Sequence, residues 1–174
     1  MRSGDDEVLV RAARVDDADA IALVHRKSWR VAYKEILPRK LLTRPLASLR
    51  EQWSSWLTGD DPDLAALVAE RGGKVVGVAL HECREADDPE LRILYVDPAE
   101  WRGGVGRALV GAVSDALRKR GAEYAVVWTF ADNVRGRRFY ESVGWALDGE
   151  SDWEGVSIVR YRRQLERSAP HGRG

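Results

Sequence analysis

The sequence predicts an α/β fold with one mixed sheet of about seven strands, mostly antiparallel, and helices in its crossover connections. Three observations support this prediction. Apolar residues recur every three or four positions between Gly104 and Arg120, which is typical of an amphipathic helix. The nearly continuous apolar run 91–96 lies before that helix and predicts a strand buried on both faces. Two further apolar runs flank Gly72 and Gly73, which favours a β-hairpin.

The first half of the chain predicts a strand, two helices and the hairpin. The segments are a strand at 8–14, a helix from 16 to 31, a second helix at 46–57, and hairpin strands at 63–70 and 74–82. Asp16 and Asp17 open the first helix as a polar cap. Pro38 and Pro45 interrupt the helical pattern, so two separate helices follow the first strand.

The second half predicts two strand-helix units and a closing hairpin. The segments are a strand at 91–96, a helix at 104–120, a strand at 124–130, a helix at 133–143, and hairpin strands at 145–150 and 155–163. Gly121 and Gly144 close the two helices. The element order is therefore β-α-α-β-β-β-α-β-α-β-β. We expect a single domain over 1–165 and a flexible polar tail at 166–174.

Length and charge restrict the functional classes. The chain has 174 residues, 44% of them hydrophobic, with 28 basic and 28 acidic side chains. A neutral chain lacks the broad positive surface with which general nucleic-acid binders neutralise phosphates, so we expect no nucleic-acid partner. No apolar run approaches membrane-spanning length and the N-terminal residues are too acidic for a signal peptide, so we expect a cytoplasmic protein without a membrane partner. Cys83 and the scattered histidines predict neither an internal disulfide nor a metal site.

The sharpest local feature is a glycine-rich turn between the strand at 91–96 and the helix at 104–120. Gly103, Gly104 and Gly106 let an anion approach the backbone, and the first N–H groups of the helix point toward it along the positive end of the helix dipole. A Walker loop needs Lys and then Ser or Thr after its last glycine, and the dinucleotide fingerprint needs a third glycine after Gly-x-Gly. Neither fits, so the turn indicates either an anion site of another kind or an ordinary helix N-terminus whose glycines allow tight packing.

The residues around this turn resemble two signatures of the GNAT superfamily of acyl-CoA-dependent N-acetyltransferases. The segment 96–106 is similar to the family's phosphate motif, Arg/Gln-x-x-Gly-x-Gly/Ala, with Trp101 at the Arg/Gln position. The segment 133–145 is similar to the second signature, Asn-x-x-(Ala/Gly)-x-x-(Phe/Leu)-Tyr-x-x-x-Gly-(Phe/Trp). The resemblance implies a sheet whose fourth and fifth strands splay apart around acetyl-CoA, the cosubstrate, with no metal.

The resemblance also implies which residues hold the cofactor. In the family, backbone groups of the splayed fourth strand pair with the pantetheine arm, and the turn holds the pyrophosphate. The residues implied here are Leu94, Tyr95, Val96, Arg102, Gly103, Gly104, Val105, Gly106, Arg107, Ala108, Asn133 and Tyr140. Trp101 leaves open which side chain contacts the pyrophosphate in place of the usual Arg or Gln.

Acetyl transfer to an amine needs a neutral nucleophile, a polarised carbonyl and a proton for the leaving thiolate. The resemblance assigns the proton to Tyr140, a phenol with an ordinary pKa of about 10, and the polarising N–H group to Val96. Glu90 is the candidate base, acting through water, and Glu82 is its rival. A solvated loop carboxylate is the alternative interpretation of Glu90.

The resemblance implies that the acceptor docks between the first helices and the final hairpin, which would bring Trp29, Tyr33 and Trp53 near residues 148–154. Trp29, Tyr33 and Glu82 are the candidate substrate-binding residues. The carboxylates within 148–154 favour a cation, so we expect a small-molecule amine or a peptide amine that attacks directly in a ternary complex. The alternative is that the tryptophans belong to the core and the carboxylates to a solvated turn. Two points stay open: a module that binds acyl-CoA without turnover, and the oligomeric state, with a homodimer as one option.

Overall fold

A computed structural model describes residues 7–165, and the predicted tail at 166–174 lies outside this range. The described residues form a seven-stranded sheet in the order β1-β2-β3-β4-β5-β7-β6. The strands are β1 (Leu9–Ala12), β2 (Leu64–Arg71), β3 (Lys74–Glu82), β4 (Glu90–Val96), β5 (Tyr124–Phe130), β6 (Ala146–Trp153) and β7 (Val156–Gln164). The helices are α1 (Ala18–Ala32), α2 (Arg39–Leu42), α3 (Leu46–Thr58), α4 (Val105–Lys119) and α5 (Val134–Ser142), with 3-10 turns η2 (Val15–Asp17) and η3 (Pro98–Glu100).

The predicted fold class is confirmed, because neighbouring strands are antiparallel everywhere except between β4 and β5. The structure adds the short helix α2, which the sequence pattern did not predict. Pro38 and Pro45 each stand immediately before a helix, at its N-cap. Both prolines therefore start helices as well as separate them, since a helix start tolerates a residue without an N–H group.

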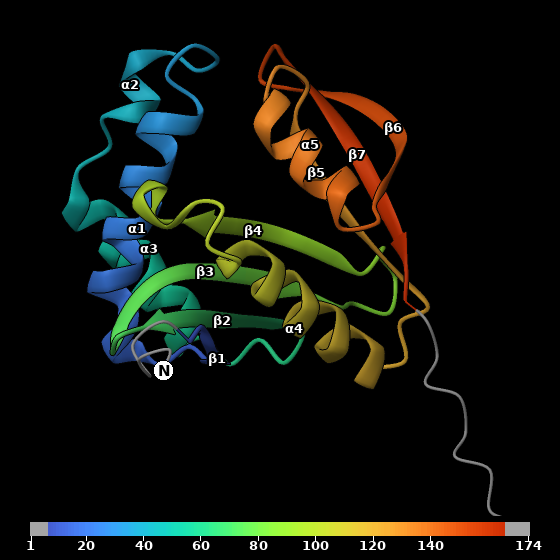
Figure 1. Cartoon of the computed structure of the whole chain (residues 1–174), viewed down its shortest axis with the longest axis horizontal. Helices are drawn as coiled ribbons and strands as arrows, with labels where there is room; N and C mark the ends of the chain where they lie inside the picture. Colours follow the sequence, from blue (N-terminus) through green and yellow to red (C-terminus); the bar gives the residue numbers. More distant parts are fainter. Residues whose placement is uncertain (1–6, 166–174) are drawn as a thin grey trace, which may run out of the picture.

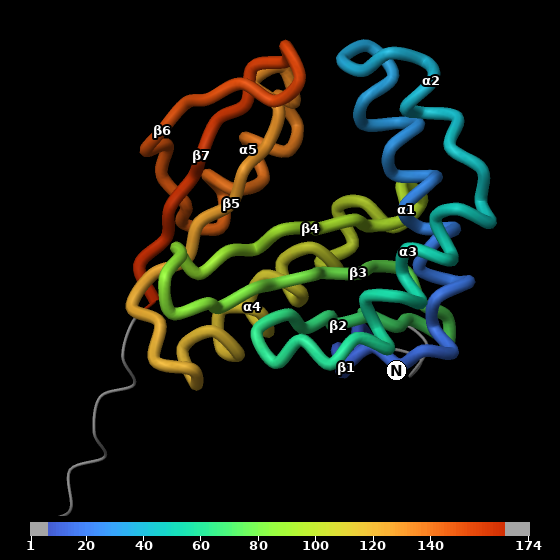
Figure 2. Tube along the Cα trace, turned by 180° about the vertical axis from the view of Figure 1, so that it is seen from behind, coloured from blue at the N-terminus to red at the C-terminus, as the bar shows by residue number. Residues whose placement is uncertain are grey.

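The helices cover both faces of the sheet (Figures 1 and 2). Helix α4 packs on one face, where Val105, Leu109 and Val113 belong to a buried cluster with residues of β2–β5. Helices α1 and α3 cover the other face, where Ile21 and Trp53 are fully buried. Two apolar cores, one on each side of the sheet, therefore fix the strands that carry the site.

Strands β4 and β5 run parallel but meet only at one end. Their backbone pairing within residues 7–165 is Glu90 opposite Val126, next to a 2.8 Å hydrogen bond from the Val126 N–H group to the Pro89 carbonyl. A β-bulge lies just beyond, where Leu91 and Ile93 pair with consecutive residues of β3 and Arg92 is the additional residue. Because a bulge bends its strand, we attribute part of the divergence to it. Figure 2 shows β5 and β7 running steeply away from β2–β4.

Within residues 7–165, no helix combines the length and apolar character needed to cross a bilayer. In the same part of the chain, no three His, Cys, Asp or Glu side chains gather in a group that could hold a metal ion.

Candidate active site

A cleft of about 950 Å³ opens between the diverging strands β4 and β5. One wall consists of β4, the turn after it and the last two turns of α1. The other consists of β5, α5 and the ends of β6 and β7. Both predicted signature segments contribute lining residues. The structure therefore brings the glycine-rich turn at 97–104, called the phosphate turn below, and the segment from Asn133 to Tyr140 to one site.

The edge of β4 that faces the cleft presents alternate backbone groups. The Asp97 N–H group donates to the Val76 carbonyl on β3 at 2.8 Å, and Val78 pairs with Tyr95 in the same register. In an antiparallel ladder, alternate residues point their N–H and C=O groups to opposite sides. Leu94 and Val96 therefore direct their backbone groups toward β5, whereas those of Tyr95 face β3. Of the three predicted residues on this strand, Tyr95 contributes its side chain to the cleft instead.

Trp101 stands at the edge of the same cleft. Its indole Nε1 donates a hydrogen bond of 3.0 Å to the Val96 carbonyl. The Arg135 guanidinium lies over the indole ring, with its central carbon 4.2 Å from the ring centroid. The cation–π contact holds a positive group from α5 beside the turn that precedes α4. This arrangement was not predicted, since Trp101 and Arg135 are far apart in sequence.

The glycine-rich turn has two residues in the left-handed region, Arg102 with φ 67° and Gly104 with φ 83°. For Arg102 this conformation costs free energy, because its Cβ crowds the backbone. Arg71, at the end of β2, holds the turn by an ion pair with Glu100 and by a 2.6 Å hydrogen bond to the Gly103 carbonyl. The turn is therefore fixed from the neighbouring hairpin.

The first turn of α4 supplies backbone donors. The first intrahelical bond runs from the Ala108 N–H group to the Gly104 carbonyl at 3.0 Å, so Ala108 already has a partner. The Gly103 N–H group donates to the Glu100 carbonyl at 3.1 Å. The backbone donors that remain are Gly104, Val105, Gly106 and Arg107, whose N–H groups precede the first helical bond. The Val105 side chain is buried in the core, so only its backbone can take part.

Gly106 allows close packing between α4 and α5. A Cβ atom at this position would lie 3.1 Å from the ring of Phe139. That distance is tighter than ordinary carbon contacts, so a side chain here would require the Phe139 ring to shift by a few tenths of an ångström.

Positive charge is concentrated at this end of the cleft. The lining arginines without an ion pair or a side-chain hydrogen bond in the described part of the chain are Arg102, Arg107, Arg135 and Arg138. Arg92 also lines the cleft but is paired with Glu82 at 2.8 Å. Guanidinium groups without an ion pair beside a helix N-terminus can bind an anion, because each can donate charge-assisted hydrogen bonds.

Tyr140 lies within the cleft lining and is only 7% exposed. Burial, with a smaller contribution from Tyr33, raises the pKa of the phenol, so Tyr140 is protonated at neutral pH. Its ring packs against Phe139, Trp145 and Tyr161. A buried, protonated phenol in the cleft is a group that can donate a proton.

Asn133 caps α5. Its side-chain oxygen accepts from the Gly136 N–H group at 3.1 Å, and its amide nitrogen donates to the Thr129 hydroxyl at 3.1 Å. The residue also lines the cleft. Asn133 therefore orders the start of α5, which carries Arg135, Arg138 and Tyr140 into the site.

Glu90 and Glu82 lie opposite each other on β4 and β3, at the end where β4 and β5 meet. Neither carboxylate is among the residues that line the cleft. Glu82 is paired with Arg84 and Arg92, which leaves it little capacity for a substrate. Burial, outweighing the nearby Arg92, raises the pKa of Glu90. A role for Glu90 in the cleft would therefore need an intervening water molecule.

The predicted acceptor residues Trp29 and Tyr33 both line the cleft, and burial raises the pKa of Tyr33 to about 12. The hairpin carboxylates do not line it. Asp148 pairs with Arg160 at 2.8 Å, and Asp152 accepts from the Gly155 N–H group at 2.7 Å within the turn.

Sequence reasoning missed three aromatic lining residues, Trp128, Phe130 and Trp153. Each is an aromatic residue at or near the end of a strand. Because this pattern is also common in hydrophobic cores, the sequence alone does not distinguish a core residue from a residue that lines a cleft.

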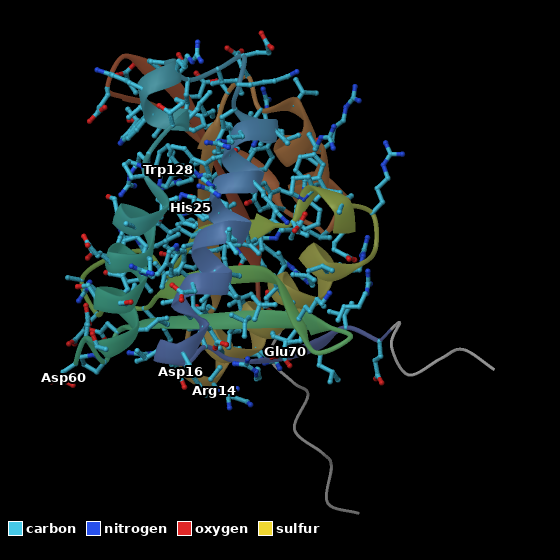
Figure 3. The ribbon with its side chains drawn as sticks, turned by 90° about the vertical axis from the view of Figure 1, so that its left-hand side faces the viewer. Arg14, Asp16, His25, Asp60, Glu70 and Trp128 are labelled. Carbon is cyan, nitrogen blue, oxygen red and sulfur yellow. The ribbon has the colours of Figure 1, made fainter. Side chains whose placement is uncertain are left out.

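His25 is a core residue rather than a site residue. Figure 3 shows it midway along α1. The Trp53 indole donates to its Nδ1 at 3.1 Å, and its ring stacks on Tyr95 at 4.5 Å. Burial, with a smaller contribution from Arg44, lowers the pKa of His25 to about 4, so the imidazole is neutral at pH 7.

A comparison with known families identifies this arrangement. The family model described as Acetyltransferase (GNAT) family matches residues 26–145, which include β4, the phosphate turn, β5 and α5. The chain belongs to this family. A solved GNAT structure agrees in fold: a PaiA N-acetyltransferase from Thermoplasma acidophilum, in complex with coenzyme A, has a TM-score of 0.76 at 19% identity, covering 91% of this chain and 99% of that one.

Relatives of this GNAT chain are named as N-acetyltransferases. A probable N-acetyltransferase of Mycobacterium tuberculosis is 27% identical over 183 residues, covering 95% of this chain and 97% of that protein. An uncharacterized N-acetyltransferase of Bacillus subtilis is 31% identical over 72% of this chain and 73% of its own length. A mycothiol acetyltransferase of Beutenbergia cavernae is 36% identical over 52% of this chain and 27% of that protein. The predicted family and enzyme class are confirmed.

Proposed function

We propose that this GNAT enzyme transfers the acetyl group of acetyl-CoA to an amine by direct attack in a ternary complex. The observation that carries the proposal is the coincidence, in one cleft, of an unpaired strand edge with an anion site. Leu94 and Val96 present backbone groups along β4, and four uncompensated arginines lie beside the N-terminus of α4.

These features fit the two chemically different parts of acetyl-CoA. The pantetheine arm carries amide groups that can pair with an exposed strand edge, which is the recognition mode of β-augmentation. The pyrophosphate suits the N–H groups of Gly106 and Arg107. Arg135, held by Trp101, supplies the cation that the motif position itself lacks.

When bound, acetyl-CoA supplies the acetyl group as an activated thioester. The Val96 N–H group faces the cleft and can polarise the thioester carbonyl. The amine nitrogen forms a bond to the carbonyl carbon while the carbon–sulfur bond breaks. Tyr140 donates its phenolic proton to the departing sulfur. The amine loses one proton in the reaction, and this proton restores the Tyr140 phenol. Acetyl transfer by this route uses no reactant besides acetyl-CoA and the amine.

Glu90 is the candidate that removes the amine proton. It acts through water from the end of the cleft at which β4 and β5 meet. A base must be ionised, so activity should fall as the pH decreases through the raised pKa of Glu90. Glu90→Gln should remove this acid limb and lower kcat, whereas Glu85→Gln, in the exposed loop nearby, should leave it. An unchanged acid limb in Glu90→Gln would remove Glu90 from the mechanism.

Acetyl-CoA binding and turnover test the proposal in two steps. Acetyl-CoA should raise the melting temperature of the protein by ligand linkage, and an amine should then release free CoA thiol. Absence of a thermal shift at millimolar acetyl-CoA would contradict the binding site. Binding without CoA release from any amine in a broad panel would favour the non-catalytic alternative.

A further inference from the structure

Four aromatic side chains form a continuous row across the cleft, from one wall to the other. Trp29 and Tyr33 lie on or just after α1, Phe130 ends β5, and Trp153 ends β6. The ring centroids of successive residues are 5.4, 5.1 and 5.8 Å apart, and each pair meets edge to face. All four residues line the cleft. This aromatic row therefore connects the wall formed by α1 to the wall formed by β5 and β6.

One end of the aromatic row lies next to the reacting position. The Trp29 ring meets Tyr95 edge to face at 6.4 Å, and Tyr95 precedes Val96, whose N–H group faces the cleft. At the other end, Trp153 is 38% exposed. A large aromatic side chain left partly exposed at a cleft is a surface that a ligand can cover. The row thus leads from solvent to the acyl position.

The lining of the cleft offers little to a polycation. Among the lining residues that the structure describes, the one carboxylate is Glu100, and Arg71 neutralises it. Asp148 of the hairpin pairs with Arg160, whereas Glu150, Asp152 and Glu154 have no ion pair within residues 7–165 but do not line the cleft. The hydroxyl groups of Ser28, Tyr33 and Thr129, which also line the cleft, are neutral. A second ammonium group inside the cleft would therefore find no unpaired carboxylate among the described lining residues.

We propose that the acceptor is an arylalkyl amine, with its aryl group packed against the aromatic row and its single amine directed toward the thioester beside Val96. This inference rests on the proposed acetyl transfer and adds the class of acceptor. Burial of a flat aryl group among edge-to-face rings gains both apolar area and favourable ring geometry. The arrangement replaces the sequence-based expectation of a cation recognised by the hairpin carboxylates.

Calorimetric titration of amines into the protein, both free and saturated with CoA, tests the proposal. The probes are 2-phenylethylamine, butylamine and spermidine. 2-Phenylethylamine should bind at least about tenfold more tightly than butylamine, as expected for burial of a phenyl group. Trp153→Ala should remove most of this preference while leaving butylamine unchanged. Leu147→Ala, an exposed position on the same strand and outside the cleft, should change neither affinity.

Equal affinities for the two monoamines, or tightest binding of spermidine, would overturn the arylalkyl class. Turnover distinguishes this failure from failure of the proposed function. If spermidine or butylamine releases CoA as readily as 2-phenylethylamine does, acetyl transfer stands and the acceptor class is wrong. If 2-phenylethylamine binds with the expected preference but no amine releases CoA, the acceptor site stands and the proposed transfer is wrong.

Discussion

Trp101 occupies the position at which the family's phosphate motif usually has Arg or Gln, and the structure places a guanidinium group from another element against it. The indole donates to the Val96 carbonyl, and its face holds the Arg135 guanidinium. In the proposed function the cation therefore comes from α5 instead of the motif itself. A sequence pattern can reveal the substitution at Trp101, but only the fold brings Arg135 to it.

Arg135 should therefore bind the cofactor phosphates. We expect Arg135→Ala to raise the KM for acetyl-CoA about tenfold, the magnitude of one lost charge-assisted hydrogen bond, with little change in kcat. Arg39→Ala, an exposed arginine on α2 outside the cleft, is the matched control. Steady-state kinetics with acetyl-CoA as the varied substrate measures both, and equal KM values would show that Arg135 has no such role.

Tyr140 should act as the general acid. Tyr140→Phe removes the hydroxyl but keeps the buried ring, so kcat should fall about a hundredfold or more while the KM for acetyl-CoA stays nearly constant. Tyr124→Phe is the control, because Tyr124 bonds to Asp88 away from the cleft. A kcat for Tyr140→Phe equal to that of the unchanged enzyme would contradict the assignment.

The phosphate turn is an element whose shape depends on a neighbouring hairpin. Arg102 holds a left-handed backbone conformation that favours glycine. Arg71 compensates by binding Glu100 and the Gly103 carbonyl from the end of β2. Arg71 is thus a positioning residue that touches the turn but does not line the cleft.

Loss of Arg71 should loosen the turn without removing a cofactor contact. We expect Arg71→Ala to raise the KM for acetyl-CoA several-fold, and Arg71→Lys to recover part of the affinity by restoring the charge. A structural role elsewhere would instead lower stability and leave the KM unchanged. Arg50→Ala, which removes an exposed ion pair with Asp19, controls for the change in charge.

At the level of elements, the sequence predicted every strand and the four longer helices, because their apolar periodicity and glycine punctuation are local signals. It could not predict the direction of the backbone groups of Tyr95, which depends on the register between β3 and β4. Nor could it place Glu82, since the partners Arg84 and Arg92 compete for the carboxylate only in the folded sheet. Pairing across strands is non-local and is fixed by tertiary packing.

Across the whole molecule, some aromatic side chains belong to the cores, whereas others line the cleft together with arginines. Of the seven Trp residues in the chain, Trp53 and Trp145 are buried in the cores, whereas Trp29, Trp101, Trp128 and Trp153 line the cleft. Although the net charge is zero, arginine is in excess at the phosphate end of the cleft. Hydroxyl and aromatic groups lie at the other end. This distribution matches a donor with phosphates and an acceptor with little charge.

The two cores also set the response of stability to pH. Burial lowers the folded-state pKa of His25 to about 4, below its ordinary value of 6.5. The contribution of neutral His25 to the free energy of unfolding is therefore complete above pH 6.5 and is lost as the pH falls toward 4. Burial lowers the pKa of His81 in the same direction. Acid should thus destabilise the fold before most carboxylates titrate.

Denaturant unfolding at pH 7 and pH 5 checks this expectation. The loss of unfolding free energy between these values should be smaller by about 2 kcal/mol in His25→Asn than in the unchanged protein, since asparagine cannot gain the proton. Asparagine also retains an acceptor for the Trp53 indole. An identical loss in both proteins would contradict the assigned role of His25.

Initial rates with acetyl-CoA and 2-phenylethylamine varied together decide whether donor and acceptor meet in the cleft between β4 and β5. Direct transfer in a ternary complex predicts double-reciprocal plots that intersect, with CoA released only when both substrates are present. Parallel lines, with acetyl-CoA releasing CoA before the amine arrives, would show that the two substrates do not meet.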